Sequence, residues 1–192
     1  MRVLSIDPGI VNLGWCVAVG EPRGTDMQIE TYGSEDVTRS CYRPDCDLPR
    51  TRELWDRLEH AYAHVLEPHC TAVDRIVIER QPPGGLTEVV SFFYSKHRAK
   101  VNIVHPCSMH TFYGIGGHPY DDRKRCTEAI AAKWVTDLHC GDGRRVHDVA
   151  DAVAFAWYFL CAVEPPPPTI PPPPHAWDAF RYHIATDRTP GS

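Results

Sequence analysis

The sequence predicts an α/β domain with a five-stranded mixed sheet flanked by helices, and two observations carry this prediction. Three apolar stretches follow one another closely at the N-terminus, which is typical of strands joined by short turns. Further along, apolar stretches alternate with segments of helical spacing, which is typical of parallel strands connected by crossover helices. The expected order is three strands, a helix, a strand, a helix, a strand and two helices.

The first three strands are expected at residues 2–7, 12–19 and 27–32. The first is largely apolar, ends in an acid and is followed by a proline and a glycine that terminate it. The short connections between the three predict an antiparallel meander. Residues 37–50 mix Arg, Pro, Cys and Asp, and we expect them to form a loop.

The remaining elements alternate between the two kinds of spacing. From Thr51 to about Leu66 apolar residues recur at helical spacing, and Pro68 is expected to end this helix. The later elements are expected in this order: strand 73–79, helix 87–98, strand 101–105, a glycine-rich loop at 114–117, helix 122–138 and helix 147–163.

The composition changes after this last helix. Residues 164–174 contain eight prolines and predict a stiff polyproline linker. We therefore expect one folded domain at 1–163, the linker at 164–174 and a C-terminal tail at 175–192.

The cysteines and the apolar stretches bear on the compartment. Eight cysteines are scattered along the chain without a Cys-x-x-Cys pair, which favours free thiols in a reducing, intracellular compartment. No stretch approaches the roughly 20 apolar residues that cross a bilayer, so no membrane partner is expected. The net charge of −5 is not that of a protein that coats nucleic acid along its whole surface.

Zinc is the alternative interpretation of the cysteines and histidines. Two groups are close in sequence: His64, His69 and Cys70, and His105, Cys107 and His110. Neither group has the spacing of a structural zinc site, so we expect free thiols and no zinc.

Four acids occupy positions that packing alone does not require. Asp7 ends the first strand, Glu79 ends the fourth, and Asp148 and Asp151 begin the last helix on one face. That helix is otherwise nearly all apolar, so it should pack on the sheet and direct at least one aspartate toward it.

Carboxylates gathered in this way need a cation. Mg²⁺, with Mn²⁺ as a substitute, is the hard ion that oxygen ligands suit, and two such ions can promote phosphodiester cleavage. Each acid also has an ordinary structural interpretation. Asp148 could cap the helix, Asp151 could suit the helix dipole, Glu79 could form a salt bridge and Asp7 could brace the turn.

Four short motifs, in chain order, resemble the RuvC-type Holliday junction resolvases, especially their poxvirus and mitochondrial branches. The motifs are Asp7-Pro8-Gly9 with Asn12 and Gly14; Ile78-Glu79-Arg80-Gln81-Pro82; Pro106 and Ser108 with Gly114, Gly116 and Lys124; and His147-Asp148 with Asp151-Ala152. The resemblance covers residues 2 to about 162, whereas residues 34–50 and the polyproline segment lie outside it.

The resemblance implies an RNase H-like fold and a homodimer that resolves four-way DNA junctions by paired, Mg²⁺-dependent nicks. It implies Asp7, Glu79, Asp148 and Asp151 as catalytic metal ligands for two ions, and Lys124 as a cation near the scissile phosphate. Arg123 and Arg125 are alternatives for the role of Lys124. A viral or organellar protein is favoured over a bacterial one, and no small-molecule substrate is expected.

The partner surfaces are also predicted. The DNA-binding residues are expected to be basic side chains of the second half and one glycine of the loop: Lys96, Arg98, Lys100, Arg123, Arg125 and Gly116. The helix at 87–98 carries several aromatic residues, which form either the dimer contact or part of the core.

Two other functions remain open from the sequence, and a third is disfavoured. The chain could be a different RNase H-like nuclease acting on flaps, hybrids or damaged DNA, because metal ions recognise phosphate geometry and not junction shape. It could be a nucleic-acid-binding homologue without catalysis, although all four acids are present. An actin-like ATPase would need two such domains, and the chain is too short for that.

Overall fold

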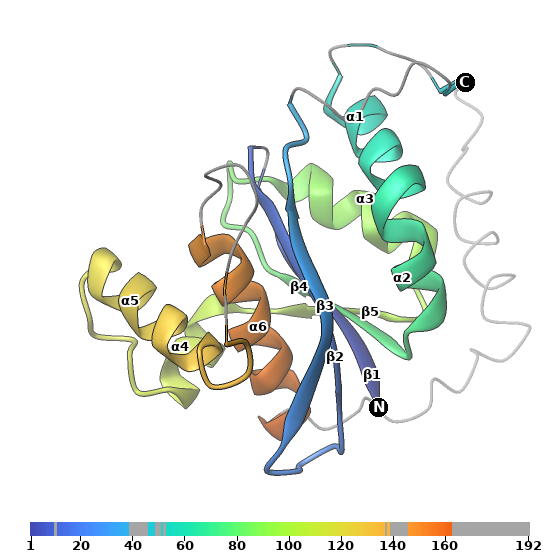
Figure 1. Cartoon of the computed structure of the whole chain (residues 1–192). Coiled ribbons are helices and arrows are strands. Elements are labelled where there is room, and N and C mark those ends of the chain that lie inside the picture. The colour runs from blue at the N-terminus through green and yellow to red at the C-terminus, as the bar shows by residue number, and fades with distance from the viewer. Residues whose placement is uncertain are drawn as a thin grey trace, which may run out of the picture.

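The structure is a computed structural model that describes residues 1–9, 11–38, 46–48, 51, 53–136, 138 and 146–162. Its centre is one sheet with the strand order β3-β2-β1-β4-β5 (Figure 1). The strands are β1 (Arg2–Asp7), β2 (Leu13–Gly20), β3 (Met27–Glu35), β4 (Arg75–Glu79) and β5 (Val101–Val104).

The sheet is mixed, as the sequence predicts. Strands β1, β2 and β3 form an antiparallel meander, whereas β4 is parallel to β1 and β5 is parallel to β4. Ile6 of β1 pairs with Ile78 of β4, so the next residue of each strand, Asp7 and Glu79, lies at the same edge.

Two helical layers cover the sheet. One face carries α1 (Leu54–Ala61), the π-helix η1 (Tyr62–Leu66), α2 (Glu67–Ala72) and α3 (Thr87–His97), and the other carries α4 (Pro106–Phe112), α5 (Tyr120–Ala131) and α6 (Val146–Ala162) (Figure 1). The strands supply both layers because successive side chains point to opposite faces. Val3 packs with α6, while Leu4 packs with α1–α3.

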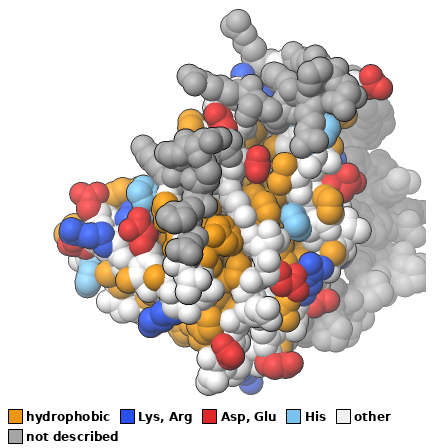
Figure 2. All heavy atoms as spheres, viewed as in Figure 1, with side chains coloured by type: hydrophobic (Ala, Val, Ile, Leu, Met, Phe, Trp, Pro, Cys, Tyr) orange, Lys and Arg blue, Asp and Glu red, His pale blue; other side chains and the backbone are white. Residues whose placement is uncertain are grey.

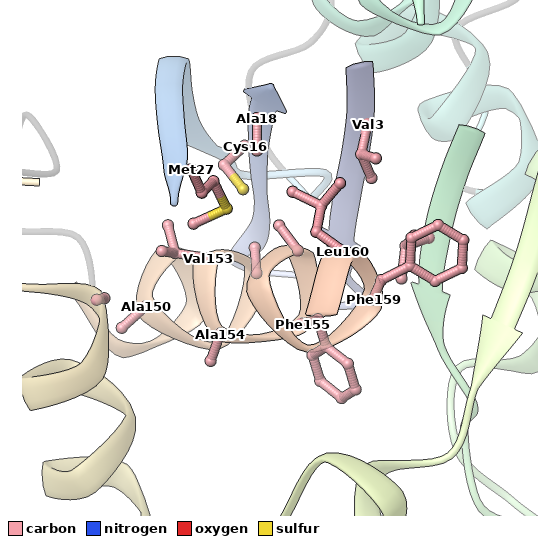
Figure 3. Packing of buried hydrophobic residues seen from close by; sticks show 14 of the residues in the cluster. Val3, Cys16, Ala18, Met27, Ala150, Val153, Ala154, Phe155, Phe159 and Leu160 are labelled. Carbon is pink, nitrogen blue, oxygen red and sulfur yellow. The ribbon is translucent and has the colours of Figure 1, made fainter. Parts of the chain in front are cut away.

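Helix α6 is the centre of its layer. Ten of its seventeen residues are buried, as expected for a helix whose sequence is apolar nearly all round. In Figure 3, Val153 and Leu160 point toward the strands that carry Cys16, Ala18 and Val3. Phe155 points the other way, where it lines a cavity beside α4 and α5.

The largest differences from the sequence prediction are in the helices. Pro68 does not end the helix, which continues to Ala72, because a proline fits in the first turn of α2 and the wider π-helical turn precedes it. Helix α5 ends at Ala131 and not at residue 138, and residues 132–134 form a turn. Helix α4 was not predicted because it is only seven residues long and begins with a proline.

The C-terminal residues 163–192 lie outside the described residues, so the domain boundary, the linker and the tail stay predictions. Among the helices that the structure describes, none is long and apolar enough to cross a membrane.

Candidate active site

Asp7 and Glu79 meet because two neighbouring parallel strands end at the same level. By the alternation of strand side chains, Asp7 shares a face with Val3, and Glu79 shares a face with Val77. Both valines belong to the cluster under α6, so both acids project toward that helix. Asp7 is buried, with 8% of its surface exposed, and Glu79 is half-buried.

Helix α6 contributes the other two acids. Asp151 is 8% exposed, and Asp148, one turn earlier, is half-buried. The first turn of α6 lies directly against Gly14 of β2, which pairs with Asp7. A Cβ atom on Gly14 would be 2.2 Å from the carbonyl oxygen of Asp148. The glycine therefore allows the helix to approach the strand that neighbours Asp7.

The carboxyl groups perturb one another. Burial raises the pKa of Asp7 well above its usual value, and the charges of Asp151 and Glu79 raise it further. Burial also raises the pKa of Glu79, while a hydrogen bond with Asp7 opposes that shift. In the metal-free protein, Asp7 and Glu79 therefore share a proton more readily than two isolated carboxyls would.

Lys124 of α5 is the cation of the site. Its ammonium forms an ion pair with the carboxylate of Asp151. Burial alone would lower the pKa of Lys124, but the charge of Asp151 and the hydrogen bond to it outweigh burial, and the pKa is raised. Lys124 is therefore charged at neutral pH, and it also lies 5.6 Å from the ring centroid of Tyr120.

A cavity of about 770 Å³ opens beside these groups. Glu79, Asp151 and Lys124 line it, together with side chains that the sequence interpretation did not assign to a site, among them Gln81, His105, His110, Tyr120 and Thr127. The acids therefore face a space that is large enough for a polymer backbone segment.

His105 is the most informative of these additional residues. It follows β5, which is parallel to β4, so it lies at the same sheet edge as Glu79. Its Nδ1 accepts a hydrogen bond from the backbone N–H of Cys107 at 3.2 Å, which caps α4. Its charge would lower the pKa of Glu79. The parallel register would have identified this residue, had the sequence shown which strands are neighbours.

His110 lines the same cavity and is half-buried. Burial lowers its pKa, and the positive charges of Arg123 and Lys124 lower it further. His110 is therefore neutral at physiological pH and can accept or donate a hydrogen bond inside the cavity.

The predicted basic residues divide into two sets, of which the first belongs to α5. Arg123 lines the cavity and donates to the backbone oxygen of His118 at 2.7 Å. Arg125 is exposed and pairs with Asp122. Of the three consecutive basic residues, Lys124 is the one whose charge reaches the acids.

The second set lies on the α1–α3 face of the sheet. Lys96 pairs with Glu59 at 2.9 Å, and Lys100 donates to the carbonyl oxygens of Cys70 and Thr71. The structure does not bring these two lysines to the acids. Arg98 lies 5.6 Å from the ring centroid of Tyr94 on the same helical layer.

Gly116 is the remaining residue that the sequence predicts to bind DNA. The Gly116 backbone is open, with His110 Cβ as the nearest atom to an added Cβ at 3.9 Å. On the face seen in Figure 2, the Lys and Arg side chains of the described residues are interspersed with acidic ones.

The donor set fits a hard divalent cation. Asp7 and Asp151 are buried carboxylates whose negative charges repel one another, and a bound cation would remove that repulsion. In the described part of the chain, no three of these acids have ligand atoms as close together as those of a compact metal site. The four carboxylates are thus spread more widely than the ligands of one compact ion site.

The fold is that of the RuvC-type Holliday junction resolvases, which is RNase H-like. The Holliday junction resolvase of fowlpox virus superposes with a TM-score of 0.60 at 13% identity, over 85% of this chain and 100% of that one. The yeast mitochondrial Holliday junction resolvase gives 0.58 at 17% identity, over 83% and 79%. Thermus thermophilus RuvC gives 0.51 at 19% identity, over 82% and 95%. The fowlpox and Thermus proteins have also been solved with Holliday junction DNA. No protein-family model and no curated protein matches the sequence.

Proposed function

We propose that this protein is a metal-dependent DNA endonuclease that resolves four-way junctions. One observation carries the proposal: Asp7, Glu79 and Asp151 come together from β1, β4 and α6, with the ammonium of Lys124 among them, at an open cavity. The similar structures of Holliday junction resolvases support the substrate class.

Asp7, Glu79, Asp148 and Asp151 are the residues that would hold Mg²⁺, with Mn²⁺ as a substitute. When bound, two such ions supply a water of lowered pKa and neutralise charge on the attacked phosphate and the leaving oxygen. The chain's own groups bind and orient the substrate. The ammonium of Lys124 attracts a phosphate oxygen, and the guanidinium of Arg123 supplies a second positive charge at the same cavity.

The paired cut predicts a C2 homodimer, because the described chain has one set of acids and a junction needs two opposed nicks. In α3, Val89, Phe92 and Phe93 are fully buried in the monomer's core, whereas Tyr94 is 39% exposed. The buried side chains therefore belong to the core, and Tyr94 with the exposed face around it is the part of α3 that remains available to a dimer contact.

The decisive experiment is cleavage of a labelled four-way junction by purified protein, with Mg²⁺ and without it. We expect paired nicks in Mg²⁺ or Mn²⁺ and none without a divalent ion. Asp7→Asn and Glu79→Gln should abolish cleavage while junction binding survives, because phosphate contacts lie outside the acids. Asp26→Asn, at an exposed position of the β2–β3 connection, is the matched control and should cut at the wild-type rate.

Linear duplex, flap and RNA–DNA hybrid substrates belong in the same assay. Faster cleavage of any of these than of the junction would assign the chain to another class of RNase H-like nuclease. Junction binding with no cleavage of any substrate in either metal would leave a binding protein without catalysis.

A further inference from the structure

A second cluster of metal-ligating side chains lies on the opposite face of the sheet from the acids. Cys46 precedes α1, His60 is in α1 and His64 is in η1. Each offers one ligand atom, and these atoms all lie within 4.8 Å of one another. Among the residues that the structure describes, this is the one group of three His, Cys, Asp or Glu side chains that is so compact.

The burial of the cluster is unusual for its chemistry. His60 is fully buried in the layer of Leu58, Tyr62 and Phe92. The Nε2 atom of His64 is also buried, and within the described residues it has no hydrogen-bond partner. Buried ring nitrogens are nearly always paired, so the Nε2 atom of His64 points to a ligand that completes it.

The geometry suits a tetrahedral ion. His60 and His64 are four residues apart, so their rings lie on one helix face, with centroids 5.9 Å apart. Zinc bonds of about 2.0–2.1 Å to nitrogen and 2.3 Å to sulfur place tetrahedral ligand atoms roughly 3.3–3.6 Å apart. Side-chain rotations closing about 1 Å would bring the three atoms to this spacing. The π-helical turn at Tyr62–Leu66 is a further sign, because such turns occur frequently at functional sites.

The sequence around the cluster has the spacing of a zinc site. Cys41 precedes Cys46 with four residues between them, thirteen residues separate Cys46 from His60, and three separate His60 from His64. Cysteine and histidine pairs at such spacings are typical of structural zinc sites. Cys41 lies outside the described residues, so only its position in the sequence enters this argument.

We propose that Cys46, His60 and His64 bind one Zn²⁺ ion that fastens the chain after β3 to the helical layer. Thiolate and imidazole ligands favour zinc over Mg²⁺, which prefers oxygen. Binding replaces the proton of the Cys46 thiol by the metal and uses the neutral imidazoles, so one proton is released from Cys46. The role is structural, because these ligands belong to the α1 and η1 side of the sheet, whereas the acids of the candidate active site face α6 on the other side.

The structure does not bring together the two groups of His and Cys residues that lie close in the sequence. His64 does not join His69 and Cys70: the His69 ring lies 4.8 Å from Trp15, and Cys70 is buried in the core. His105, whose Nδ1 caps α4 at Cys107, likewise forms no compact group with Cys107 and His110 in the described chain. The ligands instead come from two segments that are distant in sequence and adjacent in the fold.

The test is the metal content of the full-length protein, expressed with zinc and dialysed against metal-free buffer. Elemental mass spectrometry should find about one zinc ion per chain in the wild-type protein. Cys46→Ser and His64→Gln should each lower this content at least about tenfold. Cys107→Ser and His118→Gln are the matched controls at exposed positions, and they should keep one zinc.

A second measurement uses only the wild-type chain, so a variant that misfolds does not weaken the test. Zinc should protect Cys46 from alkylation, and its removal by a chelator should expose it, as read by peptide mass spectrometry. Cobalt in place of zinc should give a thiolate-to-metal absorption band. A wild-type chain that holds no zinc after reconstitution, or a Cys46 thiol that reacts equally with and without zinc, would overturn the proposal.

The zinc site is independent of the proposed nuclease activity, since neither measurement involves DNA. It also affects how metal dependence is measured. EDTA would strip zinc as well as Mg²⁺, so the cleavage assay should omit Mg²⁺ from zinc-loaded protein rather than add a chelator.

Discussion

Gly14→Ala tests how α6 brings its acids to the sheet. Gly14 pairs with Asp7 in the β1–β2 ladder and lies beneath the first turn of α6. An added Cβ would be 2.2 Å from the carbonyl oxygen of Asp148 and 2.9 Å from the amide nitrogen of Val149. Both neighbours are backbone atoms, which cannot rotate away as a side chain can.

The expected size of the effect follows from these distances. Non-bonded atoms need about 3.5 Å, so the first turn of α6 must move by about 1 Å or more. Overpacking of this kind costs about 1–3 kcal/mol of stability. For a domain of this size, about 2–4 °C per kcal/mol predicts a fall in Tm of roughly 2–12 °C. A 1 Å displacement of Asp148 and Asp151 should also lower cleavage by about 100-fold.

The assay combines thermal unfolding with junction cleavage in Mg²⁺. Gly117→Ala is the matched control, because nothing lies within 4 Å of a Cβ at that position. It should change the free energy of unfolding by less than about 1 kcal/mol and leave cleavage unchanged. If Gly14→Ala melts and cuts like the wild type, then α6 does not approach β2 as described, and the assignment of Asp148 to the site loses its basis.

Two further predictions concern the residues of the acid site, and a third concerns the number of chains. Asp7→Asn should abolish cleavage yet raise the Tm of the metal-free protein. Because burial raises the folded-state pKa of Asp7 above 3.8, its contribution to stability is fully present below that pH and is lost as the pH rises through the raised pKa. The Tm difference from the wild type should therefore widen from about pH 4 to pH 8 and shrink when Mg²⁺ is added, and a difference independent of pH would contradict the reasoning. Lys124→Met should cost about 1–3 kcal/mol, since it leaves the Asp151 carboxylate buried without its ammonium, and should lower cleavage at least tenfold. Lys133→Met, at an exposed position, is its control in the unfolding and cleavage assays. Sedimentation at micromolar concentration, with and without a junction, should show a dimer, whereas a monomer that nicks one strand per encounter would identify a simple nickase.

Much of this fold can be predicted from the sequence because its information is local. The strands at 2–7 and 73–79 are apolar runs that end in an acid, and the last helix is apolar over nearly its whole length. Such patterns depend on a residue's immediate neighbours, so the mixed sheet was predicted from them and is confirmed. The RNase H-like fold, which the motif resemblance implied, is also confirmed. The prediction that the helix ends at Pro68 was wrong because it used a local rule alone. Leu66 and Cys70 are buried in the core, and their packing favours a helix that continues past the proline.

The acids are an intermediate case. The sequence shows that Asp7 and Glu79 end strands, and Asp151 begins an apolar helix. That they share an edge and a face follows from the parallel register of β1 with β4 and from the side of the sheet that α6 covers. The motif resemblance anticipated this grouping, whereas residue patterns alone left each acid with an ordinary structural role.

The sequence by itself determined the elements, the acids at their ends and the charge of α5. Only the tertiary structure decided which side chains meet. It placed His105 beside Glu79, because β5 is a parallel neighbour of β4. It places Lys96 and Lys100 on the opposite face of the sheet from Lys124. It also brings Cys46 close to His60 and His64. The physical reason is that a local pattern fixes which face of an element is apolar. The partner of that face is chosen by strand order and layer packing, which depend on contacts across the whole chain.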